Sequence, residues 1–301
     1  MILKKKYLLV SAFFILSLFT GAFAYYKLKV RANEISGFFQ SPVLKEISGI
    51  TASHFFEDTY YVHNDSGDTS RFFAVDPQGK LITTFYFPED QRKDHPLLDC
   101  EDISVGKGPR AGKSFVYLAD IGDNANMRPY VTIYRFEEKP SWLKDSVNHV
   151  IPAQLHLTYP DGPKDAEAMM IDPIQNLIYI VNKRTDSIRI YTTPLIFKNN
   201  EDRMLTLRSK IYIKGIKPFK YITAGDISKD GSKILLKSYG KVYYWQRNGT
   251  EPVWETMQRK PTELRYDMQL QGEAISFTAD EEGYYTTSEG SFAAIYYYAL
   301  P

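Results

Sequence analysis

Short runs of β-branched and aromatic residues recur along the chain, and residues that favour tight turns separate them. DPQG (76–79) and KDG (229–231) are examples of such turns, since Asp, Pro and Gly adopt the required backbone angles readily. No long stretch repeats apolar residues with the period of an amphipathic helix. The pattern predicts an all-β protein built as an antiparallel meander. The clearest predicted strands are 60–62, 114–119, 131–136, 177–182, 188–192, 234–237, 241–245 and 283–287.

A two-part signature occurs five times and indicates a repeat architecture. Its first half joins polar, acidic or small residues to an apolar one, and its second half ends the following strand with polar residues. The first halves are ISGI (47–50), CEDI (100–103), AEAM (166–169), AGDI (224–227) and GEAI (272–275). The second halves are HNDSG (63–67), DIGDN (120–124), NKR (182–184), KSYG (237–240) and SEG (288–290).

The spacing of these copies predicts a β-propeller of five four-stranded blades. The first halves begin 53, 66, 58 and 48 residues apart, which suits a blade with its loops. Only 28 residues follow Glu273, enough for three strands. We expect residues 35–44 to supply the missing strand and so close the ring, which removes the open sheet edges. A sixth blade would have to fit into the 66-residue interval, where 155–159 already provide an outer strand.

The N-terminus has the order of an export signal. Lys4, Lys5 and Lys6 precede an apolar run at 7–24 that ends in Ala-Phe-Ala, a cleavage pattern. The run is also long enough to cross a bilayer, so an uncleaved anchor remains an alternative. The predicted organisation is a signal peptide or membrane anchor at 1–24, a linker at 25–34 and the propeller at 35–301. The protein is expected outside the cytoplasm, periplasmic or secreted, with membrane contact only through this segment.

Composition narrows the classes of partner and of stabilising bond. The chain has 37 basic and 36 acidic residues, which does not mark a nucleic-acid-binding protein. Its single cysteine, Cys100, excludes an intrachain disulfide, so stability must come from a hydrophobic core. The 23 tyrosines favour strands over helices.

Both halves of the signature are expected at one channel mouth, because the start of an inner strand lies beside the end of its antiparallel neighbour. Crowded carboxylates there repel unless they are protonated, paired with bases or bridged by a cation. Each one alone could cap a backbone amide or pair with a base, but Glu101, Glu167 and Glu273 recur at equivalent positions, which favours a functional role. The residues expected at the mouth are Asp65, Glu101, Asp102, Asp120, Asp123, Asp165, Glu167, Asp226, Glu273 and Glu289, with Arg71, Lys183, Arg184 and Lys237 around them.

Carboxylates without Cys or His partners indicate calcium rather than a transition metal. Familiar catalytic motifs are missing: the chain has no G-x-S-x-G, H-E-x-x-H or C-x-x-C. The segment GKGPRAGKS (106–114) resembles a phosphate-binding loop, but its spacing is off by one and it joins two predicted strands, so we reject that function. Candidate acid or base groups are Asp102, Asp226 and His63.

The motifs HNDSG, DCEDIS, LADIGDN, YPDGPKDAEAM, AGDISKDG and QGEAISF together resemble a largely uncharacterised family of bacterial extracytoplasmic β-propeller proteins over residues 44–300. Cys100 stands where that family usually has Trp. More distantly, the chain is similar to calcium-binding five-bladed apyrase-type nucleotidases and to phytase-like propellers. That resemblance implies one oxygen ligand per blade: Ser48, Glu101, Glu167 and Glu273, with Asp226 or Thr223 in the fourth blade, where Gly225 has no side chain.

Two functions follow from these expectations. In the first, a calcium ion at the mouth ties the blades together, and the face binds a small anionic ligand, a glycan or a protein partner. The residues expected to contact that ligand are Asn64, Asp65, Arg71, Asp120, Asp123, Lys183, Arg184, Lys237 and Glu289. In the alternative, the ion activates water in a metal-dependent hydrolase acting on a phosphate ester or another anionic substrate. The absence of an evident nucleophile favours the binding protein.

Overall fold

The computed structural model describes residues 35–88 and 99–301. The predicted signal or anchor segment and the linker lie outside the described residues. Within those residues, no helix has the length and apolar character needed to span a bilayer.

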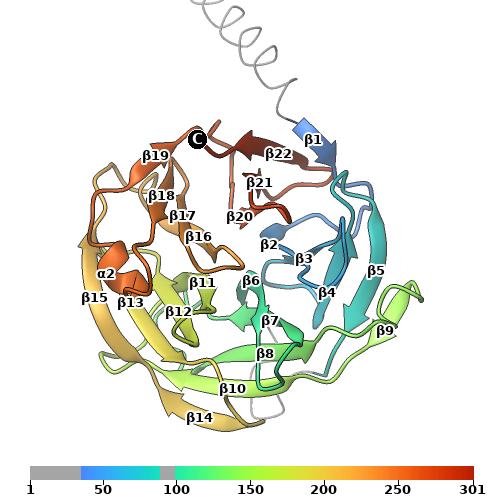
Figure 1. Ribbon diagram of the computed structural model, residues 1–301, viewed down its shortest axis with the longest axis horizontal. Coiled ribbons are helices and arrows are strands. Elements are labelled where there is room, and N and C mark those ends of the chain that lie inside the picture. The colour runs from blue at the N-terminus through green and yellow to red at the C-terminus, as the bar shows by residue number, and fades with distance from the viewer. Residues whose placement is uncertain (1–34, 89–98) are drawn as a thin grey trace, which may run out of the picture. The chain divides into compact units, whose positions relative to one another are not determined.

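Five antiparallel meanders are arranged around a common axis, as in a five-bladed β-propeller (Figure 1). The innermost strands are β2, β6, β11, β16 and β20, and each contacts the inner strands of the two neighbouring blades. The all-β, five-bladed prediction is therefore confirmed. The first blade contains β2 (Ile47–Ala52), β3 (Tyr60–Asn64), β4 (Arg71–Val75) and β5 (Leu81–Tyr86), and the second contains β6 (Cys100–Lys107), β7 (Ser114–Asp120), β8 (Val131–Glu137) and β10 (Ala153–Thr158).

The remaining three blades follow in chain order around the ring (Figure 1). The third contains β11 (Ala166–Asp172), β12 (Leu177–Asn182), β13 (Ser187–Pro194) and β15 (Thr206–Tyr212). The fourth contains β16 (Ile222–Ile227), β17 (Lys233–Ser238), β18 (Val242–Gln246) and β19 (Thr262–Leu264), with the short helix α2 (Val253–Thr256) before β19. The fifth contains β20 (Ala274–Phe277), β21 (Gly283–Thr287), β22 (Ala294–Ala299) and the N-terminal strand β1 (Ile35–Phe38).

The N-terminal strand closes the ring, as the residue count predicts. β1 pairs with β22 and completes the fifth sheet, so this blade combines one strand that precedes the first blade in sequence with the last three strands of the chain. Backbone hydrogen bonds continue beyond the strand, from Phe39 to Ala293 (3.0 Å) and from Gln40 to Gly79 (2.9 Å). Phe39 is fully buried in the core between the first and fifth blades.

Two blades carry a fifth strand that the sequence pattern does not reveal. β9 (Val147–His149) leaves the second blade and pairs in parallel with β5 of the first. β14 (Glu201–Met204) leaves the third blade and pairs in parallel with β10 of the second. The segment that contains β9 therefore accounts for part of the 66-residue interval between the second and third repeats. No sixth blade is needed to explain the length of that interval.

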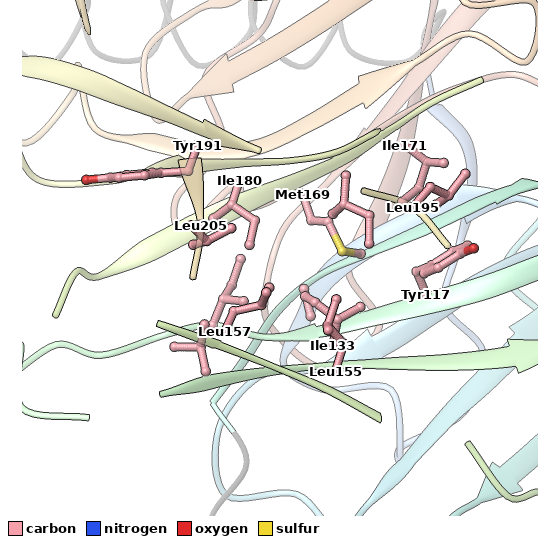
Figure 2. Close-up of a cluster of buried hydrophobic side chains, with 14 of the residues drawn as sticks. Tyr117, Ile133, Leu155, Leu157, Met169, Ile171, Ile180, Tyr191, Leu195 and Leu205 are labelled. Atoms are coloured by element: carbon pink, nitrogen blue, oxygen red, sulfur yellow. The ribbon is translucent and has the colours of Figure 1, made fainter. Parts of the chain in front are cut away.

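Apolar side chains fill the spaces between blades. The cluster in Figure 2 joins the second and third blades through residues such as Tyr117, Leu155, Met169 and Ile180, all fully buried. Cys100 is buried in the equivalent core between the first and second blades. Neighbouring blades thus cover both faces of each blade's sheet. This explains why many strands are apolar without strict alternation.

Gly37 allows β1 to dock closely on the β4–β5 turn. A Cβ at this position would lie 2.5 Å from the backbone of Gln78, so Gly37→Ala should push the closing strand away and lower the free energy of unfolding by about 1–3 kcal/mol. Urea unfolding of the two proteins measures the difference. Ser36→Ala, which loses one hydrogen bond to Pro77 in the same strand, is the control and should cost less. An unchanged midpoint for Gly37→Ala would show that closure tolerates the displacement.

Candidate functional site

A β-bulge at the start of the inner strands brings one side chain per blade to the same mouth of the ring. The register between the first and second strands shifts around Ser48, Glu101, Glu167 and Thr223 in the first four blades. In the fifth blade, Glu273 directly precedes β20. An extra residue at a bulge leaves the regular ladder and re-aims its side chain. We call this end of the ring the acidic mouth.

In the fourth blade Thr223 takes this position; it is one of the two residues that the sequence analysis offered, and Asp226, the other, does not take it. The repeat alignment, which placed Gly225 here, is therefore shifted by two residues. β16 begins at Ile222, and its bulge lies at Thr223. A shift of two residues keeps every side chain of a strand on the same face, so the polar-apolar pattern alone could not detect it. The Thr223 hydroxyl donates to the carbonyl of Gly272 in the next blade (3.3 Å).

Seven carboxylates form a connected cluster at the acidic mouth, which we call the acidic network. Their oxygens fall into three groups, within each of which the atoms lie within 4.8 Å of one another. The groups are Asp65–Asp99–Glu101, Asp65–Glu273–Glu289 and Glu101–Asp165–Glu167. Asp65 and Glu101 each belong to two groups and so connect four blades. Glu101 and Glu167 belong to the same group, whereas Glu273 is connected to Glu101 through Asp65. The three glutamates therefore lie in one network but do not meet at a single point.

Asp99 was missed by the sequence analysis. It directly precedes β6 and begins the DCEDIS motif, which is the only signal that could have identified it. Gly122 of the DIGDN motif lies against it: a Cβ on Gly122 would come within 2.5 Å of the Asp99 carboxylate and would also meet Glu101. The glycine therefore makes room for two members of the acidic network.

Lys183 is the cation in closest contact with the acidic network. Its Nζ lies 2.5 Å from Oε1 of Glu167 and 4.0 Å from Oε1 of Glu273. The Tyr239 hydroxyl also donates to Glu273. Burial disfavours the charge of Lys183, but Glu167 outweighs it and raises the lysine pKa. Arg184 pairs with Asp165 at 2.9 Å, and its side chain is 42% exposed, so it can also reach a ligand.

The group Asp65–Asp99–Glu101 has no such partner: within residues 35–88 and 99–301, no ion pair joins it to a base. Burial, followed by repulsion from Glu273 and Asp99, raises the pKa of Asp65 to about 6. Burial and the charges of Glu167 and Asp65 raise the pKa of Glu101 well above its usual value. Oε2 of Glu167 is buried and has no hydrogen-bond partner in the described part of the chain. Either a proton or a cation can relieve the repulsion among these carboxylates.

Several of the predicted ligand-binding residues make contacts within the protein. The Asn64 carboxamide accepts from the backbone of Lys45 and Glu46, and Arg71 pairs with Asp68 at 2.7 Å. Asp120 pairs with Arg128 at 2.8 Å, and Asp123 accepts from the backbone amides of Met127 and Arg128. Lys237 is fully buried, its ammonium donates to Thr223 and to the Gly272 carbonyl, and burial lowers its pKa to about 7. Asp65, Lys183, Arg184 and Glu289 remain at the acidic network.

The candidate bases Asp102 and Asp226 join neighbouring blades. The Asp102 carboxylate accepts from the amides of Ile103 (2.9 Å), Met169 (2.9 Å) and Gly225 (3.4 Å). Asp226 accepts from Ile227 (2.8 Å), Phe277 (2.9 Å) and Ser276 (3.3 Å), and lines a small cavity at the mouth opposite the acidic network.

His63, in the second strand of the first blade, is fully buried, with Nδ1 2.9 Å from the carbonyl of Asn64. Burial lowers its pKa to about 4, so the ring is neutral at pH 7. It packs where a side chain on Gly49 would otherwise lie. Its surroundings are those of a core residue.

The fold and site define the protein as a five-bladed β-propeller with buried acidic clusters that could hold a metal ion. Compared with models of known protein families and with curated proteins, the chain gives no significant match.

We expect Asp102→Asn to lower the free energy of unfolding by about 1–3 kcal/mol, because an amide nitrogen cannot accept from the backbone amides that the lost oxygen served. Chemical denaturation measures the loss. Asp76→Asn, in the exposed β4–β5 turn, is the control for removing a carboxylate that accepts within its own turn. If Asp102→Asn were as stable as the parent protein, the hydrogen bonds that Asp102 accepts from neighbouring blades would not contribute to stability.

Proposed function

We propose that the acidic network binds a divalent cation, and that this cation is calcium. The observation that supports this most is the group Asp65–Asp99–Glu101, three clustered carboxylates that form no ion pair with a base within the described residues. Calcium prefers six to eight oxygen ligands and tolerates irregular geometry. Carboxylates from separate blades, supplemented by water, suit that preference better than the compact octahedron of magnesium.

The proposed ion acts as a structural link and as part of a ligand-binding face. It joins residues of the first and second blades directly, and Asp65 and Glu101 extend the link to the fifth and third blades. With the ion bound, Lys183 and the exposed guanidinium of Arg184 add positive charge at the same mouth. The expected partner is therefore a small anionic ligand, or a glycan or protein that presents anionic or oxygen ligands, outside the cytoplasm.

Binding is favoured over the alternative of metal-dependent hydrolysis. The residues considered as bases, Asp102, Asp226 and His63, engage in contacts between or within blades. A hydrolase would need a general base that is free to accept a proton from water near the ion. The acidic mouth is therefore proposed to bind a ligand and not to hydrolyse one.

Calcium should raise the melting temperature and a chelator should lower it. At about 100 times its dissociation constant, an ion that binds only the folded state adds about 2.7 kcal/mol, or roughly 5 °C for a domain of this size. Glu101→Gln should blunt the response, because Glu101 belongs to two of the three groups, and magnesium should restore less than calcium. Thermal unfolding by circular dichroism measures each shift.

The matched control is Glu263→Gln, an exposed carboxylate paired with Lys241 in the outermost strand of the fourth blade and outside the acidic network, whose calcium response should equal that of the parent protein. Gly122→Ala provides a second test, since it leaves every carboxylate in place but crowds Asp99 and Glu101. Identical melting curves in chelator and in calcium would contradict the proposal.

Without calcium, stability should fall as the pH rises from about 4 to 8. The native pKa values of Asp65 and Glu289 are raised from 3.8 to about 6 and from 4.5 to about 8, so the folded state holds more protons than the unfolded state in this window. Calcium competes with these protons, so its stabilising effect should grow over the same range. Urea unfolding at pH 5 and pH 8, with calcium and with chelator, measures both trends. Glu289→Gln removes one titrating group and should flatten the trend seen in chelator.

A further inference from the structure

The mouth opposite the acidic network contains a pocket with a volume of about 300 Å³. Antiparallel connectivity places the ends of the inner strands here, and the pocket is lined by the connections β2–β3, β6–β7, β11–β12 and β16–β17. Its volume lies at the lower end of the range for small-molecule sites. Four different blades therefore build a pocket that is separate from the acidic network.

The polar residues around this pocket are predominantly basic. Lys107, Lys113, Lys229 and His54 line it, and no Asp or Glu is among the described residues that do. In the described part of the chain, no ion pair engages the three lysine ammonium groups. Burial and the charge of Lys229 lower the pKa of His54 to about 4, so His54 stays neutral at pH 7 and offers both a donor and an acceptor.

Two carboxylates, Asp226 and Glu281, line the small cavity beside the pocket but not the pocket itself. Asp226 is engaged by backbone amides there, and the Glu281 carboxylate accepts from the backbone amide of Lys229. Neither pairs with a lysine ammonium that lines the pocket. Three like charges around one pocket repel, and an anion placed among them relieves that repulsion.

An apolar wall completes the pocket. Phe55, Val105, Ile171, Pro173 and Ile227 line it between the basic residues. A ligand with an apolar body could bury surface against them while its charged group meets the lysines at the rim. A bare inorganic anion would leave this wall without a partner.

The segment GKGPRAGKS contributes two of the lysines, which gives a structural context to a motif that the sequence analysis rejected. It joins β6 to β7 as a hairpin, so no helix N-terminus is available, as expected. Lys107 ends β6 and Lys113 directly precedes β7, so both lysines lie at the base of the hairpin beside the pocket. Any contribution to anion binding comes from these side chains.

We propose that this pocket is a second binding site, for a small organic anion with a compact phosphate or carboxylate group and an apolar body. The lysines hold the anionic group, and the wall formed by Phe55, Val105 and Ile171 holds the body. The site is independent of calcium, because no member of the acidic network lines it. It therefore stands whether or not the acidic mouth binds a metal.

Titration calorimetry with phenyl phosphate in the presence of chelator tests this proposal. We expect saturable binding of one equivalent, weaker binding at higher salt, and no heat with benzyl alcohol, which has the ring but no charge. Lys113→Gln and Lys229→Gln should each raise the dissociation constant by about tenfold, the size of one charge-assisted contact. Both side chains are exposed, so neither substitution should affect folding.

Lys80→Gln is the matched control, since Lys80 is an exposed lysine in the β4–β5 turn outside the pocket; its affinity should equal that of the parent protein. Glu101→Gln should likewise leave the affinity unchanged, which separates this site from the acidic mouth. Absence of saturable binding overturns the proposal. Equal affinity in the Lys113→Gln/Lys229→Gln double variant would also overturn it, because phenyl phosphate would then bind elsewhere.

Discussion

Convergence of five inner strands on one axis is the constraint on which the rest of the structure depends. These strands pack side by side without forming a common sheet, so backbone amides that face the next blade need side-chain acceptors. Thr51 accepts from Val105, Asp102 from Met169 and Asp226 from Phe277, each across a boundary between blades. Short polar residues on the inner strands are therefore part of the scaffold, and the first question about any of them is which amide it serves.

In the outer part of the ring, extra strand pairing reduces the number of open sheet edges. β1 pairs beside β22 and closes the circle, while β9 and β14 each extend the blade before their own. Between these layers, aromatic and aliphatic side chains form cores that each belong to two blades. A chain without disulfides thus holds its blades together by burial, by shared strands and by polar contacts near the axis.

The meander also separates charge along the axis. Inner strands start at one mouth and end at the other, so residues of the bulges gather at the first and residues of the hairpin turns at the second. Carboxylates dominate the first mouth, and Lys107, Lys113 and Lys229 surround a pocket at the second. Charges of one sign held together favour ions of the other sign, and this is the basis of the two binding sites proposed above, one for a cation and one for an anion.

The sequence by itself determined the blade count, the closing strand and the shared position of Glu101, Glu167 and Glu273, because turn residues, strand length and repeat spacing are local properties. Only the tertiary structure decided that Thr223 takes the fourth position, since a shift of two residues preserves the alternation of a strand. It also decided that Asp102 serves backbone amides, that Asp99 joins the acidic network and that Lys113 borders a pocket. Those assignments depend on residues of other blades, which are distant in sequence, and no local pattern records which blade a side chain will face.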